Sequence, residues 1–496
     1  MSTPHSFPAR WLLLSAAFVG CGSGEIQGGP SPNPGIPATV TVTPDPAVLL
    51  VQDSIQLSAI VKDASGQVIL NPTVSWAIGN SQVASISSTG RIRGLQAGAT
   101  TATATSGSAS GQGNVTVNAP PVPGGSYHPD LMTYLGGTDE DMARDVTVDP
   151  AGNVIAAGGT FSSNFPVTAG AYDVARASGF SPPSDAWVTK VSPGGAMLWS
   201  TFLGGPNYER TYAVEVDGQG FVYVAGRAGA GFPVTPGAFQ TTFGGGSVQN
   251  SYGPQDAFVC KIKPDGSALV WCSYFGVGDD GITRDLAIDG QGNVYLVGWT
   301  TAGGFPSAWF ANAYQPTKGA GDDVIVAKIK GDGSQVLWAT YLGSSGQDGG
   351  TPAVRVDNSG NVVVLFSTTS PNLPTPNGGD PTLNGQNDMF LAKLSPDGSQ
   401  LLYGTYLGGN GQEASETHGL AVDPQGNALV AVATSSTNLA TTTGAFQRQY
   451  GGGSFDGVVW KVSPTGTILA NTYYGGAGYE GIQGVSTDAQ GNVYLS

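Results

Sequence analysis

Two sets of carboxylates recur at matching places along residues 130–496. The first set comprises Asp141, Glu209, Asp280, Asp348, Glu413 and Glu480. The second comprises Asp185, Asp256, Asp323, Asp388 and Asp456. A ring of such side chains would bind Ca²⁺ or a cationic ligand, and the choice of metal is left open. The structural alternative is that each carboxylate accepts hydrogen bonds from loop amides, a role typical of a feature that every copy shares.

Two further sets of charged residues recur in the same way, one of turn aspartates and one of lysines. The third set contains the aspartates that open an Asp-x-x-Gly turn, namely Asp149, Asp217, Asp289, Asp357, Asp423 and Asp488. The fourth contains Lys190, Lys261, Lys328, Lys393 and Lys461, which lie among apolar residues. We expect the aspartate to close a hairpin by accepting backbone N–H groups, with the glycine left-handed. A lysine among apolar neighbours should pair with an aspartate on the first or third strand of its repeat.

Cys260 and Cys272 occupy two positions where other copies carry mostly small residues, such as Thr189 with Ser200. Small residues at both positions indicate that the two face each other on neighbouring strands. A cross-strand disulfide and two free thiols are both open outcomes, because the strand register decides whether the Cβ atoms approach closely enough.

No constellation typical of catalysis is present in the sequence. The three histidines are His5, His128 and His418, and no Cys-x-x-Cys, His-Glu-x-x-His or Gly-x-Ser-x-Gly motif occurs. Glycine runs lack the Lys-Ser/Thr that follows a phosphate-binding loop. We therefore assign no catalytic residue, expect no enzyme, and expect no cofactor apart from the Ca²⁺ considered above.

The elements that must position these side chains come from an internal repeat. Six copies of an Asp-led hairpin, such as VDPAGNVIAAG and IDGQGNVYLVG, follow one another at spacings of 65 to 72 residues. Each full copy predicts four strands, A to D, with the lead aspartate between A and B. Four short antiparallel strands repeated in this way are typical of a β-propeller blade. The D-to-A and B-to-C connections should emerge at the same end.

The repeats resemble the SBBP family, which implies a propeller of seven-bladed type over nearly all of residues 130–496. The resemblance is carried by D-x-x-G-N-x-Y-x-x-G, F-P-V-T-x-G-A-F-Q, D-A-F-V-x-K and the closing T-Y-L-G-G. The third copy departs from the pattern at 307–311 and the fourth at 374–380. Five copies are full and the sixth is partial, so we expect the propeller to be incomplete at its C-terminal end. Leu131–Leu135 is predicted to be a D strand.

Residues 38–118 predict a separate β-sandwich. Alternating segments at Thr39–Val42, Ser54–Val61, Thr73–Ile78, Val83–Ser87 and Thr100–Thr105 are typical of strands with one buried face, and Trp76 is the expected core aromatic. The motifs VTVTPDPAVLLVQDSIQLSAIVKDASG and VSWAIGNSQVASISSTGRIRGLQAGATTATAT resemble the group 2 bacterial Ig-like family. Members of that family usually serve as spacers or adhesive modules. The fold class is therefore all-β, an Ig-like sandwich followed by a propeller.

The N-terminus indicates export. Residues 1–21 combine Arg10 with a short apolar run and end in Phe18-Val19-Gly20-Cys21, which resembles a bacterial lipobox. The resemblance implies acylation of Cys21 and, with Gly22 after it, an outer-membrane lipoprotein. Residues 22–37 and 119–129 are expected to be linkers. The only expected membrane contact is this lipid anchor, and we expect the protein to lie at the cell surface.

The composition narrows the function. With a net charge of −16 the surface repels phosphate backbones, which excludes nucleic acid and favours cationic partners. We expect a monomeric, surface-bound binding or adhesion protein with a protein or glycan ligand. Its B-to-C loops carry aromatic residues that could contact this ligand, namely Phe180, Phe243, Trp309 and Tyr450. The alternatives are a secreted polysaccharide hydrolase or lyase and a purely structural envelope component.

Overall fold

The structure, a computed structural model, describes residues 35–51, 54–118, 132–177, 184–245, 252–278, 282–414, 418–488 and 490–496. The chain divides into two compact units, residues 1–123 and 124–496. The export signal, with Cys21, lies outside the described residues. In the described part, no helix is both long and apolar enough to cross a membrane.

The first unit is a β-sandwich. Its strands are β1 (Pro37–Thr43), β2 (Ala47–Leu50), β3 (Ser54–Gln56), β4 (Ser58–Asp63), β5 (Ser75–Ile78), β6 (Ala84–Ile86), β7 (Arg91–Gly94), β8 (Gly98–Ser106) and β9 (Ala109–Asn118). They form sheets in the orders β2-β9-β8-β5, β3-β7-β6 and β1-β4. Alternate residues of β9, such as Val115 and Val117, are buried in the core. Trp76 packs half-buried against this core, so the expected sandwich and its aromatic residue are confirmed.

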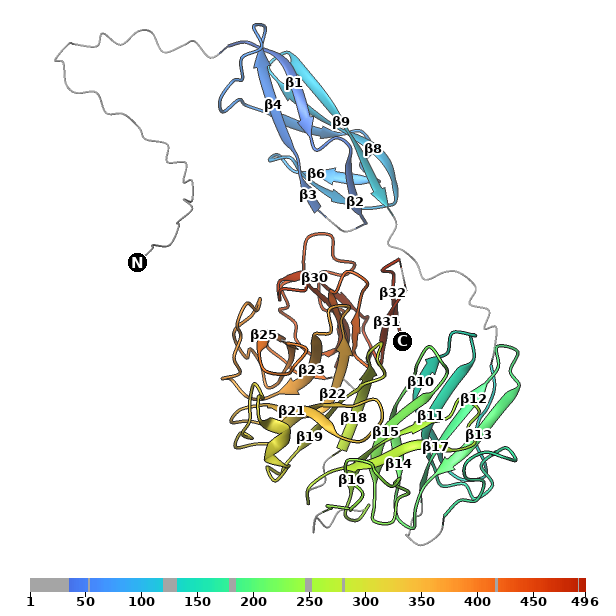
Figure 1. Ribbon diagram of the computed structural model, residues 1–496. Helices are drawn as coiled ribbons and strands as arrows, with labels where there is room; N and C mark the ends of the chain where they lie inside the picture. The colour runs from blue at the N-terminus through green and yellow to red at the C-terminus, as the bar shows by residue number, and fades with distance from the viewer. Residues whose placement is uncertain are drawn as a thin grey trace, which may run out of the picture. The chain divides into compact units, whose positions relative to one another are not determined.

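The second unit consists of repeated four-stranded antiparallel sheets (Figure 1). Blade 1 contains β10 (Asp141–Val148), β11 (Val154–Thr160), β12 (Asp185–Val191) and β13 (Met197–Leu203); blade 2 contains β14 (Arg210–Val216), β15 (Val222–Ala228), β16 (Asp256–Ile262) and β17 (Leu269–Phe275). Blade 3 contains β18 (Ile282–Ile288), β19 (Val294–Thr300), β20 (Asp323–Ile329) and β21 (Val336–Leu342); blade 4 contains β22 (Asp348–Val356), β23 (Val362–Thr368), β24 (Asp388–Leu394) and β25 (Leu401–Leu407). Blade 5 contains β26 (Glu413–Ala414), β27 (Leu420–Val422), β28 (Ala428–Thr434), β29 (Asp456–Val462) and β30 (Ile468–Tyr474); β31 (Val485–Thr487) and β32 (Val493–Leu495) follow as a pair.

Neighbouring blades stack through apolar faces. Ile155 and Val188 of blade 1 share one buried cluster with Val224 and Phe258 of blade 2, and similar clusters join the later blades. The first strands of successive blades, β10, β14, β18 and β22, lie against one another in order. This arrangement is consistent with a propeller of four-stranded blades, so the predicted all-β fold class is confirmed.

Blades 1 to 3 are each also joined to the next blade by a tryptophan ring. The indole N–H of Trp338 at the start of the fourth strand of blade 3 donates to the Pro396 carbonyl of blade 4 at 3.1 Å. Its ring covers Gly398, whose φ is +68°. Trp199 and Trp271 make the same contact with Pro264 and Gly331 at 3.0 Å. We call this contact the tryptophan joint.

One sequence prediction for the second unit differs from the structure, and one departure from the repeat pattern has a structural explanation. Residues 132–135 are not in a strand, and Leu135 instead packs beside Phe165 and Trp187 of blade 1. The departure in the third copy is a 3₁₀ turn, η1 (Ser307–Phe310). The turn places Trp309 on Phe275 of blade 2, with stacked rings 5.7 Å apart, so packing explains the changed sequence.

Candidate functional site

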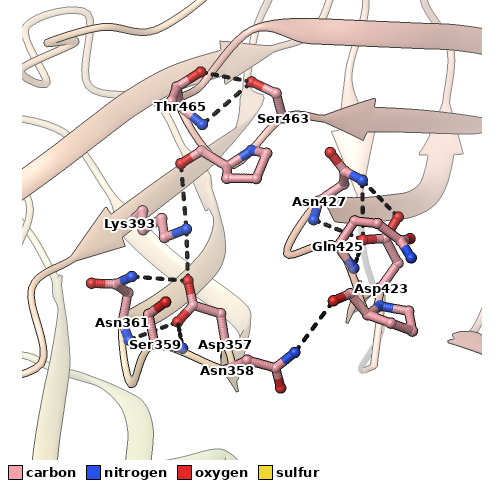
Figure 2. A network of polar contacts seen from close by, with 12 residues as sticks. Asp357, Asn358, Ser359, Asn361, Lys393, Asp423, Gln425, Asn427, Ser463 and Thr465 are labelled. Atoms are coloured by element: carbon pink, nitrogen blue, oxygen red, sulfur yellow. Dashed lines mark hydrogen bonds and ion pairs between the residues drawn. The ribbon is translucent and has the colours of Figure 1, made fainter. Parts of the chain in front are cut away.

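The lead aspartates and the lysines form one repeated network. Figure 2 shows the turns that Asp357 and Asp423 open and the ion pair of Lys393 with Asp357. Asp357 accepts hydrogen bonds from the backbone N–H groups of Ser359 and Asn361 at 2.8 and 2.9 Å. Lys393 Nζ lies 2.7 Å from the other oxygen of the same carboxylate. The equivalent ion pairs join Lys190 to Asp149, Lys261 to Asp217, Lys328 to Asp289 and Lys461 to Asp423. The turn role of the aspartates and the pairing of the lysines are both confirmed.

The two carboxylate sets lie at the end of the blades where the D-to-A and B-to-C connections meet, as predicted. Asp280 lies outside the described residues. Eight of the others have no exposed surface, namely Asp185, Glu209, Asp256, Asp323, Asp348, Asp388, Glu413 and Asp456, whereas Asp141 and Glu480 are partly exposed. Loop amides donate to these acids: Gly205 to Glu209 at 3.0 Å, for example.

This burial agrees with the structural alternative for both carboxylate sets. No group of three or more His, Cys, Asp or Glu side chains in the described ranges is arranged to hold a metal ion. Cation binding by the ring stays a prediction.

The carboxylates pair across the junctions between blades. The N–H of Glu413, which opens blade 5, donates to the Asn387 carbonyl of blade 4 at 3.1 Å and brings Glu413 beside Asp388. A Cβ atom on Gly408 would lie 2.6 Å from Glu413 Oε2, so a glycine is needed there. Burial raises the pKa of Asp388 to about 7, and the Glu413 carboxylate adds to the rise. Burial likewise raises the pKa values of Asp185 and Glu209 to about 7.

These pKa shifts predict how stability depends on pH. A carboxyl group whose pKa is raised by folding favours the folded state below its unfolded pKa, and this contribution is lost as the pH rises towards 7. We expect Asp388→Asn, which removes the charge and keeps an acceptor for the Asn384 N–H, to raise the urea midpoint at pH 8 and flatten its decline between pH 5 and 8. Asp397→Asn in an exposed turn is the control. An equal decline in wild type and Asp388→Asn would contradict the prediction.

Cys260 and Cys272 face each other directly on β16 and β17, with Cα atoms 4.0 Å apart, and the structure joins them by a disulfide. The same positions hold Thr189 and Ser200 in blade 1, whose hydroxyl groups lie 2.7 Å apart. The inference of facing positions is therefore confirmed, and the disulfide lies inside one blade.

A β-bulge occurs at the same place in the first strands of blades 1 to 3. In β10, β14 and β18 the register shifts around Arg144, Tyr212 and Arg284, respectively. A bulge changes the direction of its extra side chain and is over-represented next to active sites. The guanidinium carbons of Arg144 and Arg284 lie 5.8 and 4.6 Å from the centre of the Tyr212 ring, within cation–π range. The three bulge residues therefore gather into one group.

Arg210 and Arg227 extend this group. They stand directly opposite each other on β14 and β15, although they are only 7 % and 6 % exposed. Their guanidinium carbons lie 5.3 and 4.8 Å from the centre of the Tyr208 ring, and Arg227 also lies 4.1 Å from that of Tyr252. Across the described ranges, neither arginine has a carboxylate within ion-pair distance. We call the set the arginine–tyrosine cluster: Arg144, Arg210, Arg227, Arg284, Tyr208, Tyr212 and Tyr252.

A cavity of about 510 Å³ lies beside Arg144 along the first strands and is lined by acids and bases. Burial raises the pKa of Glu215 to about 7, and the nearby Arg355 acts in the opposite direction. Arg355 Nη1 pairs with Asp285 Oδ2 at 2.6 Å, and His418 Nε2 lies 3.5 Å from Asp145 Oδ1. The sequence alone assigned no role to these residues.

Sequence reasoning missed the cluster because it followed positions that all copies share. The informative positions are those where the copies differ. The last-but-one residue of the second strand is Gly159, Arg227, Trp299, Ser367 and Ala433 in blades 1 to 5. Of the aromatics expected on the loops, Phe243 and Trp309 pack against buried clusters, Tyr450 packs on Tyr473, and Phe180 is not described.

Comparisons with known proteins agree with the fold. Residues 38–117 match the family described as bacterial Ig-like domain (group 2), and residues 270–306 match the family described as beta-propeller repeat. The chain therefore carries an Ig-like domain and a propeller repeat. No curated protein matches the sequence.

Several solved structures resemble the chain at low identity. A protein of unknown function from Dyadobacter fermentans is 12 % identical, with a TM-score of 0.34 over 68 % of this chain and 95 % of that one. An ulvan lyase of a new polysaccharide lyase family is 7 % identical, with a TM-score of 0.33 over 66 % of this chain and 69 % of the lyase. A variant of NanB sialidase from Streptococcus pneumoniae is 8 % identical, with a TM-score of 0.41 over 88 % of this chain and 82 % of the sialidase. At these values the similarities carry no argument about function.

Proposed function

We propose that the second unit is a binding module for an anionic ligand, which it holds between Arg210 and Arg227. The observation that carries the proposal is the direct opposition of two buried arginines that share one tyrosine ring. Like charges directly opposite on neighbouring strands are destabilising, and a buried charge without a partner is costly. An anion placed between the two guanidinium groups would remove both costs and gain charge-assisted hydrogen bonds.

The local charge differs from the charge of the whole chain. The net charge of −16 favours cationic partners in general. However, the Glu209 carboxylate beside the cluster is buried and accepts hydrogen bonds from the N–H groups of Gly205 and Gly229. Among the described residues, no acid of the two carboxylate sets pairs with Arg210 or Arg227. The ligand expected here is therefore a carboxylate or sulfate group rather than a cation.

The first test measures binding of inorganic sulfate at low ionic strength by isothermal titration calorimetry. We expect Arg227→Gln to weaken binding by about tenfold or more, because a charge-assisted hydrogen bond is lost. Without ligand, the same variant should unfold at an equal or higher temperature than wild type, since the like-charge opposition is gone. Binding should weaken as salt is added.

Arg448→Gln is the matched control for this test, because Arg448 is an exposed arginine on a B-to-C loop of blade 5. It removes the same charge without touching the cluster, so its affinity for sulfate should equal that of wild type. Equal loss of affinity in both variants, or lower stability of ligand-free Arg227→Gln, would argue against the proposed site.

The proposal keeps the chain as a binding protein carried at the cell surface on a lipid anchor at Cys21, with the Ig-like unit as a spacer. Glycan cleavage is the second candidate, and it is favoured by one observation, the raised pKa of Glu215 in the neighbouring cavity. Measuring the chain length of an acidic glycan after incubation decides between the two functions, since a binding protein leaves the length of the glycan unchanged.

A further inference from the structure

A second pocket, of about 590 Å³, lies between blades 3 and 4. Trp299 of β19 lies in its lining, together with the amide side chains of Gln347, Gln386, Asn387 and Gln412. These residues come from the second strand of blade 3 and from D-to-A and B-to-C connections. The pocket therefore opens at the same end of the blades as the arginine–tyrosine cluster.

Trp299 differs from the tryptophans that join blades. In the described part of the chain, no group accepts a hydrogen bond from its indole N–H, whereas Trp199, Trp271 and Trp338 all donate to a turn carbonyl. A Cβ atom on Gly349 would lie 2.9 Å from Trp299 Cβ, so this glycine makes room for the side chain. The Trp299 side chain is half-buried rather than fully packed, and the residue lies in the lining of the pocket.

Three of the side-chain amides beside Trp299 retain free hydrogen-bonding capacity, whereas Asn387 Nδ2 already donates to Ser367 Oγ and to the Glu413 carbonyl. Gln412 Nε2 donates to Gln386 Oε1 at 2.5 Å, which orients both side chains and leaves Gln386 Nε2 and Gln412 Oε1 available. Gln347 and Asp322 also line the pocket, and neither the Gln347 side-chain amide nor the Asp322 carboxylate has a hydrogen-bond partner among the described residues. Adjacent donors and acceptors next to an aromatic ring are suited to a polyhydroxylated ring, whose apolar face can lie on the indole.

The pocket is continuous with the arginine–tyrosine cluster. Arg284 lines the pocket, and its guanidinium carbon lies 4.6 Å from the centre of the Tyr212 ring. The same ring lies 5.7 Å from the guanidinium carbon of Arg227. Asp322 would accept hydrogen bonds from hydroxyl groups and repel an anionic substituent, which directs the charged part of a ligand towards the arginines.

We propose that the ligand is an acidic polysaccharide, with an uncharged sugar ring on Trp299 and the carboxylate or sulfate of a neighbouring unit at Arg210 and Arg227. This inference rests on the proposed anion site and adds the sugar subsite. The ring position, the free amides and the adjacent arginines then serve one extended ligand that lies across blades 2 to 4.

The test uses the full chain and three hexasaccharides: hyaluronan, which carries carboxylates; chondroitin sulfate, which also carries sulfates; and uncharged maltohexaose. Inorganic sulfate serves as the small anion. We expect Trp299→Ala and Gln386→Ala to weaken binding of a charged hexasaccharide by about tenfold while leaving sulfate affinity unchanged. Trp299→Phe should restore most of the affinity, and circular dichroism and the unfolding temperature show whether each variant is folded.

The results separate the two proposals. Tighter binding of a charged hexasaccharide than of sulfate or maltohexaose, lost in Trp299→Ala, supports the sugar subsite. The comparison of hyaluronan with chondroitin sulfate then identifies the anionic group. Equal affinity of wild type and folded Trp299→Ala, or no gain of either charged hexasaccharide over sulfate, overturns the subsite and leaves the anion site standing. If wild type binds neither sulfate nor any charged hexasaccharide, both the anion site and the sugar subsite are overturned.

Discussion

Replacing Asp357 by Ala should lower the free energy of unfolding of the second unit by about 3–5 kcal/mol, the usual cost of leaving one partner of a buried ion pair alone. Lys393 and Asp357 have side chains only 4 % and 6 % exposed, and their charged atoms lie 2.7 Å apart. The substitution leaves the ammonium group without its carboxylate. It also removes the acceptor of the Ser359 and Asn361 N–H groups. Urea unfolding followed by tryptophan fluorescence measures the loss.

Asp332→Ala is the matched control for this change. Lys330 and Asp332 are also 2.7 Å apart, but their side chains are 47 % and 54 % exposed, so the control should cost about 0–1 kcal/mol. A similar loss of unfolding free energy in both variants would show that burial does not decide how much the ion pair stabilises the fold.

The Asp357 pair also has a pH signature. Burial alone would raise the pKa of Asp357, but the hydrogen bonds from Lys393 and Asn361 outweigh it and hold the pKa below its usual value. A lowered pKa stabilises the folded state above the unfolded pKa, and this stability is lost as the pH falls. Wild type should therefore lose more stability between pH 5 and 3 than Asp357→Ala does.

Gly398→Ala should destabilise the second unit by about 2–5 kcal/mol, because it combines backbone strain with a steric clash. The new Cβ atom would lie 2.5 Å from Trp338 Cε3, and φ at this position is +68°. The ring can move only by giving up its hydrogen bond to the Pro396 carbonyl. The measurement is again the urea midpoint, and the fluorescence of Trp338 should shift because its indole becomes more exposed to solvent.

The control here is Gly170→Ala. Gly170 has a φ of +85°, but nothing lies within 4 Å of its added Cβ atom. This variant should cost only the backbone strain, about 1–2 kcal/mol. If Gly398→Ala costs no more than Gly170→Ala, then the tryptophan joint contributes little to the contact between blades.

Much of the fold could be predicted from the sequence because every copy repeats the same local chemistry. The Asp-x-x-Gly turn, the alternation of the strands and the lysine among apolar residues each point to one local structure, and all three recur in the structure. The pairing of Lys393 with Asp357 was predictable for the same reason, since a buried ammonium group needs a carboxylate within its own sheet.

The candidate site could not be predicted in the same way. Arg210 and Arg227 are 17 residues apart in the sequence, and only the register of β14 with β15 shows that they face each other. The bulge in β14 shifts that register by one residue, which alternation along the strand does not reveal. The pocket around Trp299 is built from separate connections, whose paths depend on how neighbouring blades stack.

The tryptophan joint also bears on how such a chain could change in evolution. The ring belongs to one copy and the glycine beneath it to the next. A gene duplication that adds one whole copy would therefore supply both residue types that the contact between blades needs. The array could then grow or shrink without inventing new complementary surfaces. Substitutions such as those that placed Arg227 and Trp299 could accumulate in single copies, so specificity could diversify while the contacts between blades stay the same.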